Sequence, residues 1–171
     1  MELKGQDILV ALKLAASPAK VSYAELGRLV GLSASQAFSA VQRASRAGLI
    51  VGTPRRANTH ALLEFLVHGV KYGFPPVRGP SRRGMPTAHS AEPLLSSIRG
   101  NSEPLVWADA EGDLRGETLK PLYKSAPFAA KQDANLYAML ALVDAIRAGR
   151  ARERDLAARK LEEILTNAEQ V

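Results

Sequence analysis

Apolar residues near the N-terminus recur at helical steps of three and four residues. Those between residues 6 and 16 fall on one face of a helix, which Pro18 ends. Ser22 and Glu25 have the spacing of a capping box, in which the hydroxyl accepts from the amide three residues on and the carboxylate reaches back. The pattern predicts a first helix up to Pro18 and a second helix that begins at Tyr23.

A third helix is predicted from the next capping signal. Ser33 and Gln36 repeat the capping-box spacing, and Gly48 supplies a left-handed end. The stripe expected on the buried face consists of Ala37, Phe38, Val41 and Ala44. The opposite face is therefore expected to be polar and exposed.

Beyond Gly48 the pattern changes twice. The apolar run Leu49–Val51 is long enough for one short strand, because Gly52 and Pro54 bound it. A fourth helix, capped by Asn58 or Thr59, then runs through Val70 with apolar residues on nearly every side. We expect such a helix to be buried.

The rest of the chain alternates between irregular and helical patterns. Residues 73–93 are rich in glycine and proline, which excludes a helix and favours an extended or looped segment. Residues 96–127 have weak periodicity, whereas apolar stripes return over 136–146 and 156–165. The predicted fold is mainly α, with an N-terminal domain over 1–72, a basic arm or linker over 73–95 and a C-terminal helical region over 96–171.

Charge points to an acidic partner. The 171 residues include 23 Lys and Arg against 17 Asp and Glu, and the first 91 residues hold twelve of the positive charges and four of the negative ones. Nucleic acid is therefore the first partner to consider. The chain has no cysteine, no apolar run long enough to span a bilayer and no secretion signal, so we expect a cytoplasmic protein with no membrane partner.

The segment from Tyr23 to Ile50 has the layout of a helix-turn-helix, and it resembles the winged helix-turn-helix transcriptional regulators of the MarR-like kind. The resemblance covers residues 1 to about 72. Ala24, Gly31 and Val41 match the small residue, the turn glycine and the buried aliphatic residue that let the two helices cross closely. Residues 49–58 leave little room for a two-stranded hairpin. The short β wing is thus expected to be reduced, or to take its second strand from the arm.

The predicted outer face of the third helix carries side chains that can read DNA. Glutamine pairs with adenine edges, arginine with guanine edges, and serine adapts to either. The residues expected at base edges are Ser35, Gln36, Ser39 and Arg43, and those expected at phosphates are Gln42 and Arg46. The alternative is an ordinary solvated face, on which Gln36 only completes the cap.

Two further groups of arginines suit phosphate contact. Arg55 and Arg56 lie where a wing would approach the DNA backbone. Arg78, Arg82 and Arg83 lie in the glycine- and proline-rich arm, from which they would reach phosphates or the minor groove. The alternative for the arm is a solubilising loop.

The sequence offers little for catalysis or metal binding. His60 and His68 lie eight residues apart, without the four-residue spacing or the cysteine partners of zinc sites. We expect His68 to be buried and hydrogen-bonded, or to belong to an interface. No phosphate loop or nucleophile elbow occurs, and the spacing of Ser96, His89 and Asp109 specifies no triad. We expect no enzyme activity, no metal and no cofactor.

The C-terminal stripe mixes both signs of charge around its leucines, which favours ion pairs on a wet face and leucines against a partner helix. We expect these helices to pair two subunits; the alternative is packing back onto the N-terminal domain. The function expected is a sequence-specific regulator of transcription, acting as a dimeric repressor on double-stranded DNA. The alternative is a protein-interaction module, such as the antitoxin of a toxin–antitoxin pair, that grips its partner with residues 92–171 and binds DNA for autoregulation.

Overall fold

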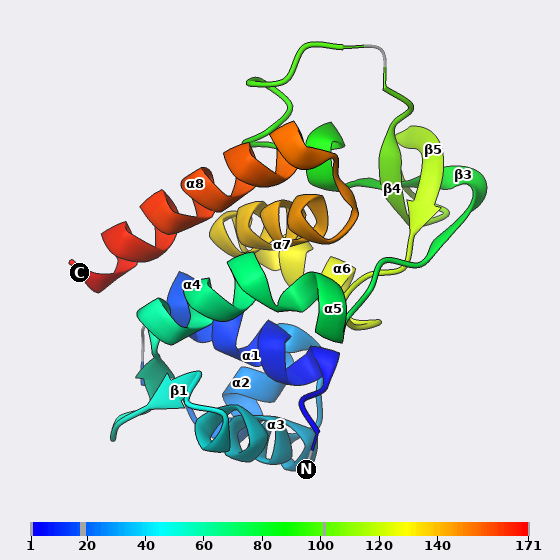
Figure 1. The fold of residues 1–171 in the computed structure, drawn as a ribbon. Coiled ribbons are helices and arrows are strands. Elements are labelled where there is room, and N and C mark those ends of the chain that lie inside the picture. The colour runs from blue at the N-terminus through cyan, green and yellow to red at the C-terminus, as the bar shows by residue number, and fades with distance from the viewer. Residues whose placement is uncertain (1, 18–19, 101, 171) are drawn as a thin grey trace.

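The computed structural model describes residues 2–17, 20–100 and 102–170, and it is mainly helical, as expected (Figure 1). Its helices are α1 (Gly5–Ala16), α2 (Tyr23–Val30), α3 (Ala34–Arg46), α4 (Thr59–His68), α5 (Val70–Gly73), α6 (Ala126–Gln132), α7 (Ala134–Ala148) and α8 (Ala151–Glu169), with a 3-10 turn at Ala88–Ser90. Its strands are β1 (Ile50–Val51), β2 (Arg56–Ala57), β3 (Arg78–Pro86), β4 (Leu105–Ala108) and β5 (Leu114–Leu119).

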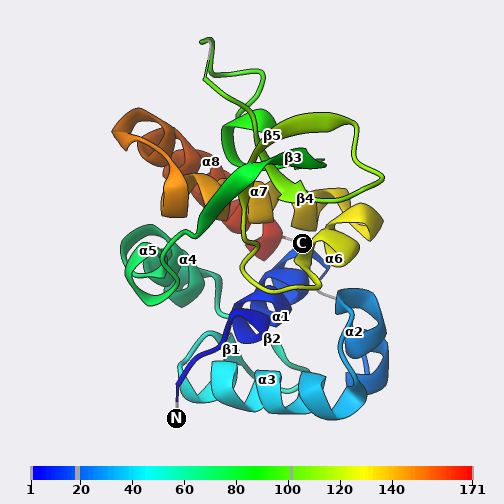
Figure 2. The same cartoon turned by 90° about the vertical axis from the view of Figure 1, so that its right-hand side faces the viewer.

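Helix α1 lies at the centre of the molecule. All its residues from Asp7 to Ala15 are buried, because α2 and α3 pack on it from one side and α7 from the other (Figures 1 and 2). Helix α7 is buried over most of its length as well. One continuous apolar core therefore joins the N-terminal helices to the C-terminal ones.

Helix α8 packs on α7 and α4 of its own chain (Figure 1). Leu161 and Leu165 are buried by this packing, at 0% and 1% exposure. The expectation that this leucine stripe faces a second subunit is therefore wrong for these two residues, and the alternative, packing within the chain, accounts for them.

A hairpin fits between α3 and α4. Strand β1 pairs with β2 in antiparallel register, with Ile50 opposite Ala57 and Val51 opposite Arg56. The strand expected within residues 49–51 is confirmed as β1, and two residues per strand are enough to form a reduced hairpin with β2. The second strand is local and does not come from the 73–95 arm.

The arm itself contributes a strand. Strand β3 pairs antiparallel with both β4 and β5, which pair in parallel, and together the three close a small barrel. Pro80 falls at a register shift between Gly79 and Ser81, where no ladder hydrogen bond is needed from its nitrogen, and Pro86 is the last residue of the strand. The glycine- and proline-rich composition is therefore compatible with a strand, and residues 96–171 are not purely helical.

Helix α4 is less buried than its composition predicts. Leu62 and Leu66 are buried, but Leu63, Phe65 and Val67 are only half-buried. His68 is exposed, so the expectation of a buried histidine is wrong. Within the described ranges, none of the helices has both the length and the apolar character needed to cross a membrane.

Candidate nucleic-acid interface

The N-terminus of α3 is fixed by the capping box that the sequence predicts. The Gln36 amide donates to Ser33 Oγ at 3.1 Å, and the Ser33 amide donates to Gln36 Oε1 at 2.9 Å. The carbonyl oxygen of the Gln36 side chain is thus engaged in the cap. This agrees with the alternative in which Gln36 only completes the cap of an ordinary solvated helix face. Gln36 nevertheless remains exposed.

The inner face of α3 is built from small residues. Ala37, Ala40 and Ala44 are fully buried and Val41 is 3% exposed, where α3 meets α1 and α2. At the crossing of α2 and α3, a Cβ on Gly27 would lie 2.5 Å from the Leu32 carbonyl oxygen, so only glycine fits. Gly27, rather than Ala24, permits the close approach, and the role expected of Ala24 is wrong because that residue is exposed.

The outer face of α3 is polar and faces away from the rest of the chain (Figure 2). Ser35, Gln42 and Arg46 are exposed, Ser39 is half-buried, and the helix contains no acidic residue. Phe38 was expected in the buried stripe, but 48% of it is exposed. Its ring lies edge-on to the ring of Tyr23, with the centroids 5.1 Å apart, at the flank of this face.

Arg43 does not lie on the outer face, and its expected contact with a base edge is wrong in this conformation. Its Nε and Nη2 donate to Asp7 of α1 at 2.8 and 2.7 Å. The carboxylate of Asp7 is fully buried, and it also accepts from the Lys4 amide at 2.9 Å. These hydrogen bonds and the nearby negative charge raise the pKa of Arg43. Arg43 therefore links α3 to α1, and its guanidinium group is not available to a DNA base in this arrangement.

The two arginines of the hairpin have different environments. Arg55 folds back against the start of α2: its guanidinium carbon lies 3.9 Å from the centroid of Tyr23, and its Nη2 donates to the Val21 carbonyl at 2.8 Å. Arg56 on β2 is exposed. Beside Arg55, a cleft of about 300 Å³ runs between the hairpin and α3, and Lys20, Gln42 and Ser45 also line it. This cleft places cationic and hydrogen-bonding groups next to the outer face of α3.

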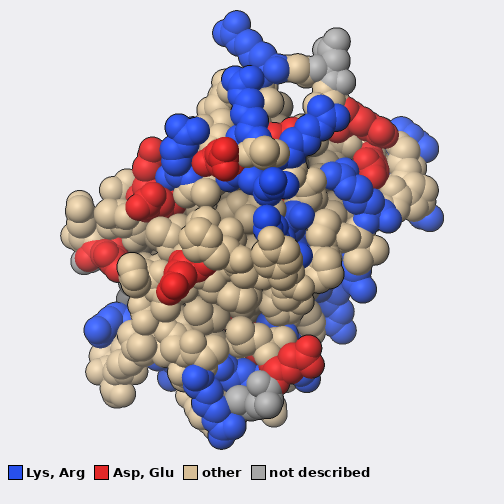
Figure 3. Space-filling view, viewed as in Figure 1, with Lys and Arg blue, Asp and Glu red and all other residues tan. Residues whose placement is uncertain are grey.

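The arginines of β3 are remote from α3. Figures 1 and 2 place the barrel and α3 at opposite ends of the molecule. Arg82 and Arg83 are exposed there, whereas Arg78 pairs with Glu117 at 3.2 Å and donates to the Ala148 carbonyl at 2.7 Å. Figure 3 shows basic and acidic side chains intermixed around this end. The structure thus splits the predicted set of DNA-binding residues into two surfaces.

Two of the buried polar clusters are built around carboxylates deep in the core, Asp7 and Asp144, and neither was predicted. Asp7 in α1 is one, and its only sequence signal is a carboxylate beside a run of apolar residues. The other is Asp144 of α7, which accepts from Thr87 Oγ1 at 2.7 Å, Trp107 Nε1 at 2.8 Å and Arg147 Nη1 at 2.8 Å. Burial, partly offset by Arg147, raises the pKa of Asp144. This cluster fastens β4 and the turn after β3 to the core.

The described residues do not bring three metal-binding side chains of His, Asp or Glu together. What the α3 surface offers is a set of hydrogen-bonding and cationic groups on a rigid helix. No family model matches the chain, and neither a curated protein nor a solved structure matches it.

Proposed function

We propose that residues 1–72 form a winged helix-turn-helix domain and that the protein is a cytoplasmic, non-catalytic, sequence-specific regulator of transcription. The observation that carries the proposal is the outer face of α3: Ser35, Gln42 and Arg46 are exposed on a helix without acidic residues. The hairpin β1–β2 stands beside that helix as a wing would.

The geometry suits the major groove of duplex DNA. The 13 residues of α3 form a helix about 20 Å long, and the major groove is wide enough for one helix to lie in it. Gln42 lies seven residues after Ser35 and so on the same side of α3, and we therefore assign it to base edges with Ser35 rather than to the phosphates expected from the sequence. Arg46 and Arg56 can then neutralise phosphates. Arg43 holds the helix in place, so its contribution to DNA binding is indirect.

A dimeric repressor on a palindromic site remains part of the proposal. Two copies would not meet through Leu161 and Leu165, because those residues are buried within one chain. The contact between copies therefore uses another face, and half-sites one helical turn apart are expected.

The test is a fluorescence anisotropy titration with labelled duplexes that tile the DNA upstream of the protein's own coding frame. A double variant, Ser35→Ala with Gln42→Ala, should weaken binding to the preferred duplex at least about tenfold. The variant Gln132→Ala, in an exposed position on α6, should leave binding unchanged. Equal affinity for every fragment and for a shuffled duplex at moderate salt would contradict the proposal.

A second candidate is the protein-interaction module, such as an antitoxin, and one observation favours it. Leu95 and Phe128 are apolar yet 54% and 51% exposed, and both lie within residues 92–171. Co-purification of the full chain from its native cell tests this candidate. A stoichiometric protein that Leu95→Asp or Phe128→Asp releases supports it, and purification of the chain alone contradicts it.

A further inference from the structure

The outer side of α3 carries one large apolar side chain among its polar ones. Phe38 is 48% exposed. It follows Ser35 by three residues and precedes Gln42 by four, and residues at these spacings are neighbours on the surface of a helix. The phenyl ring therefore lies on the same side of α3 as the two residues that we assign to base edges.

Contacts with α2 and the hairpin hold this ring in place. The ring of Tyr23, the first residue of α2, meets it at an angle of 78°, with the centroids 5.1 Å apart. The Arg55 guanidinium lies over the Tyr23 ring at 3.9 Å and is fixed by its hydrogen bond to the Val21 carbonyl, of 2.8 Å. Because Phe38 is packed in this way, it loses little conformational freedom when a ligand covers it.

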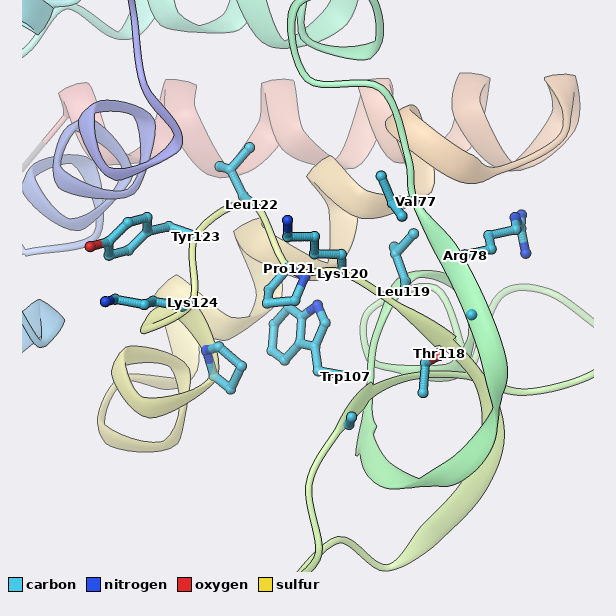
Figure 4. Close-up of a pocket in the computed structure, with 13 residues that line it drawn as sticks. Val77, Arg78, Trp107, Thr118, Leu119, Lys120, Pro121, Leu122, Tyr123 and Lys124 are labelled. Carbon is cyan, nitrogen blue, oxygen red and sulfur yellow. The ribbon is translucent and has the colours of Figure 1, made fainter.

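Helix α2 is itself braced at its other end. The connection between the barrel and α6, which Figure 4 shows from Lys120 to Lys124, continues to Ser125. Ser125 Oγ donates to the carbonyl of Val30, the last residue of α2, at 2.6 Å. Tyr23 thus belongs to a helix that is anchored to the C-terminal half of the chain, and the position of Phe38 does not depend on α3 alone.

The major groove displays one apolar group that matches an exposed phenyl ring. Each thymine places its C5-methyl group there, and phenylalanine is one of the side chains that contact it. The polar side chains of Ser35 and Gln42 can satisfy donors and acceptors of base edges, but they bury no methyl group. A helix that docks with Ser35 and Gln42 toward the bases brings Phe38 into the same groove.

We propose that Phe38 is a specificity-determining residue, which packs on the C5-methyl group of a thymine in the preferred site. This inference rests on the proposed function, because it requires α3 to lie in the major groove. It adds a base identity that the polar residues of α3 do not specify.

The test removes the methyl group from the DNA and leaves the protein intact. Each thymine of the preferred duplex is replaced in turn by deoxyuridine, which pairs with adenine in the same way but lacks the C5-methyl group. Affinity is measured by fluorescence anisotropy. Loss of one buried methyl group should weaken the parent protein about fourfold at the thymine that Phe38 contacts.

The variant Phe38→Ala should lower this thymine-to-uracil ratio to less than about 1.5, and it should bind the uracil duplex within about twofold of the parent. Phe38→Leu retains an apolar side chain beside Tyr23, and its ratio should stay above about twofold. The control is Arg56→Ala, an exposed change on β2. It should weaken both duplexes equally and leave the fourfold ratio intact, because a phosphate contact does not distinguish bases.

A ratio near one at every thymine, in a parent protein that still prefers this duplex, would overturn the inference and leave the proposed function standing. An equal ratio in the parent and in Phe38→Ala would assign the methyl group to another residue and would also overturn it. A protein that prefers no duplex contradicts the proposed function, and the assignment of Phe38 falls with it.

Discussion

Replacing Arg43 tests whether that residue is a structural anchor or a reader of bases. In the structure its guanidinium makes two hydrogen bonds, of 2.7 and 2.8 Å, to a carboxylate of Asp7 that is fully buried. The variant Arg43→Ala leaves this carboxylate with the Lys4 amide but without its counter-ion. Removal of one partner from a buried ion pair costs about 3–5 kcal/mol in free energy of unfolding.

The assay is urea unfolding at neutral pH, followed by far-ultraviolet circular dichroism. With an m-value of about 2 kcal/mol/M, a loss of 4 kcal/mol lowers the midpoint by about 2 M. Gln42→Ala, an exposed change on the same helix, should alter stability by less than about 0.5 kcal/mol. The double variant Asp7→Ala with Arg43→Ala should cost less than the sum of its single variants, since it removes the unpaired charge.

The reasoning fails if Arg43→Ala unfolds within about 0.5 kcal/mol of the parent and loses only affinity for DNA. That result would mean that Arg43 faces the solvent in solution, as a base-reading role requires.

Three other substitutions test contacts at the start of α7, at the buried Asp144 and in the turn between α2 and α3. Burial raises the pKa of Asp133, but Lys13 and the backbone amides at the start of α7 outweigh it, and the net pKa lies below 3.8. The stabilisation that the ionised Asp133 carboxylate provides is therefore complete above that pH, and it is lost as the pH falls through the folded pKa. Asp133→Asn should lower the free energy of unfolding by about 1 kcal/mol at neutral pH. In urea titrations this difference should shrink at low pH, and a constant difference down to the lowest pH would refute the reasoning. Thr87→Val, which removes a hydroxyl donor to the buried Asp144, should cost about 1–3 kcal/mol by urea unfolding, and a neutral effect would contradict the hydrogen bond. Gly31→Ala, at a φ of +75° and against Ser125, should lower the thermal midpoint by several degrees, or about 1–2 kcal/mol, and an unchanged midpoint would show that the turn relaxes.

Short-range sequence signals, above all the helix-capping residues, predict the starts of the two helices at the candidate interface. The capping serines Ser22 and Ser33 mark the starts of α2 and α3, since each satisfies an amide of its own helix. The error on α3 concerns its flanks. Phe38 and Arg43 lie about 110° from the centre of the alanine-rich stripe, on opposite sides. Hydrophobicity assigns the phenylalanine to the inside, but only the distant Asp7 decides that the arginine turns inward.

Hydrophobic periodicity and composition did not predict the barrel formed by β3, β4 and β5. Strand β5 reads Leu-Arg-Gly-Glu-Thr-Leu, and its burial does not alternate strictly, so it carries a weak signal. Strand β3 contains two prolines that argue against a ladder, and only the bulge beside Pro80 makes room for one of them. The pairing of β3 with β5 joins segments far apart in the chain, which composition and periodicity do not encode. The separation of Arg82 and Arg83 from α3 follows from that pairing.

The most direct test of the central claim is hydrogen exchange of the protein on its preferred upstream duplex, compared with the free protein. The account predicts slower exchange in α3 and in the hairpin β1–β2, with no change in the exposed face of α8. Protection confined to the barrel or to α8, with α3 unchanged, would contradict it.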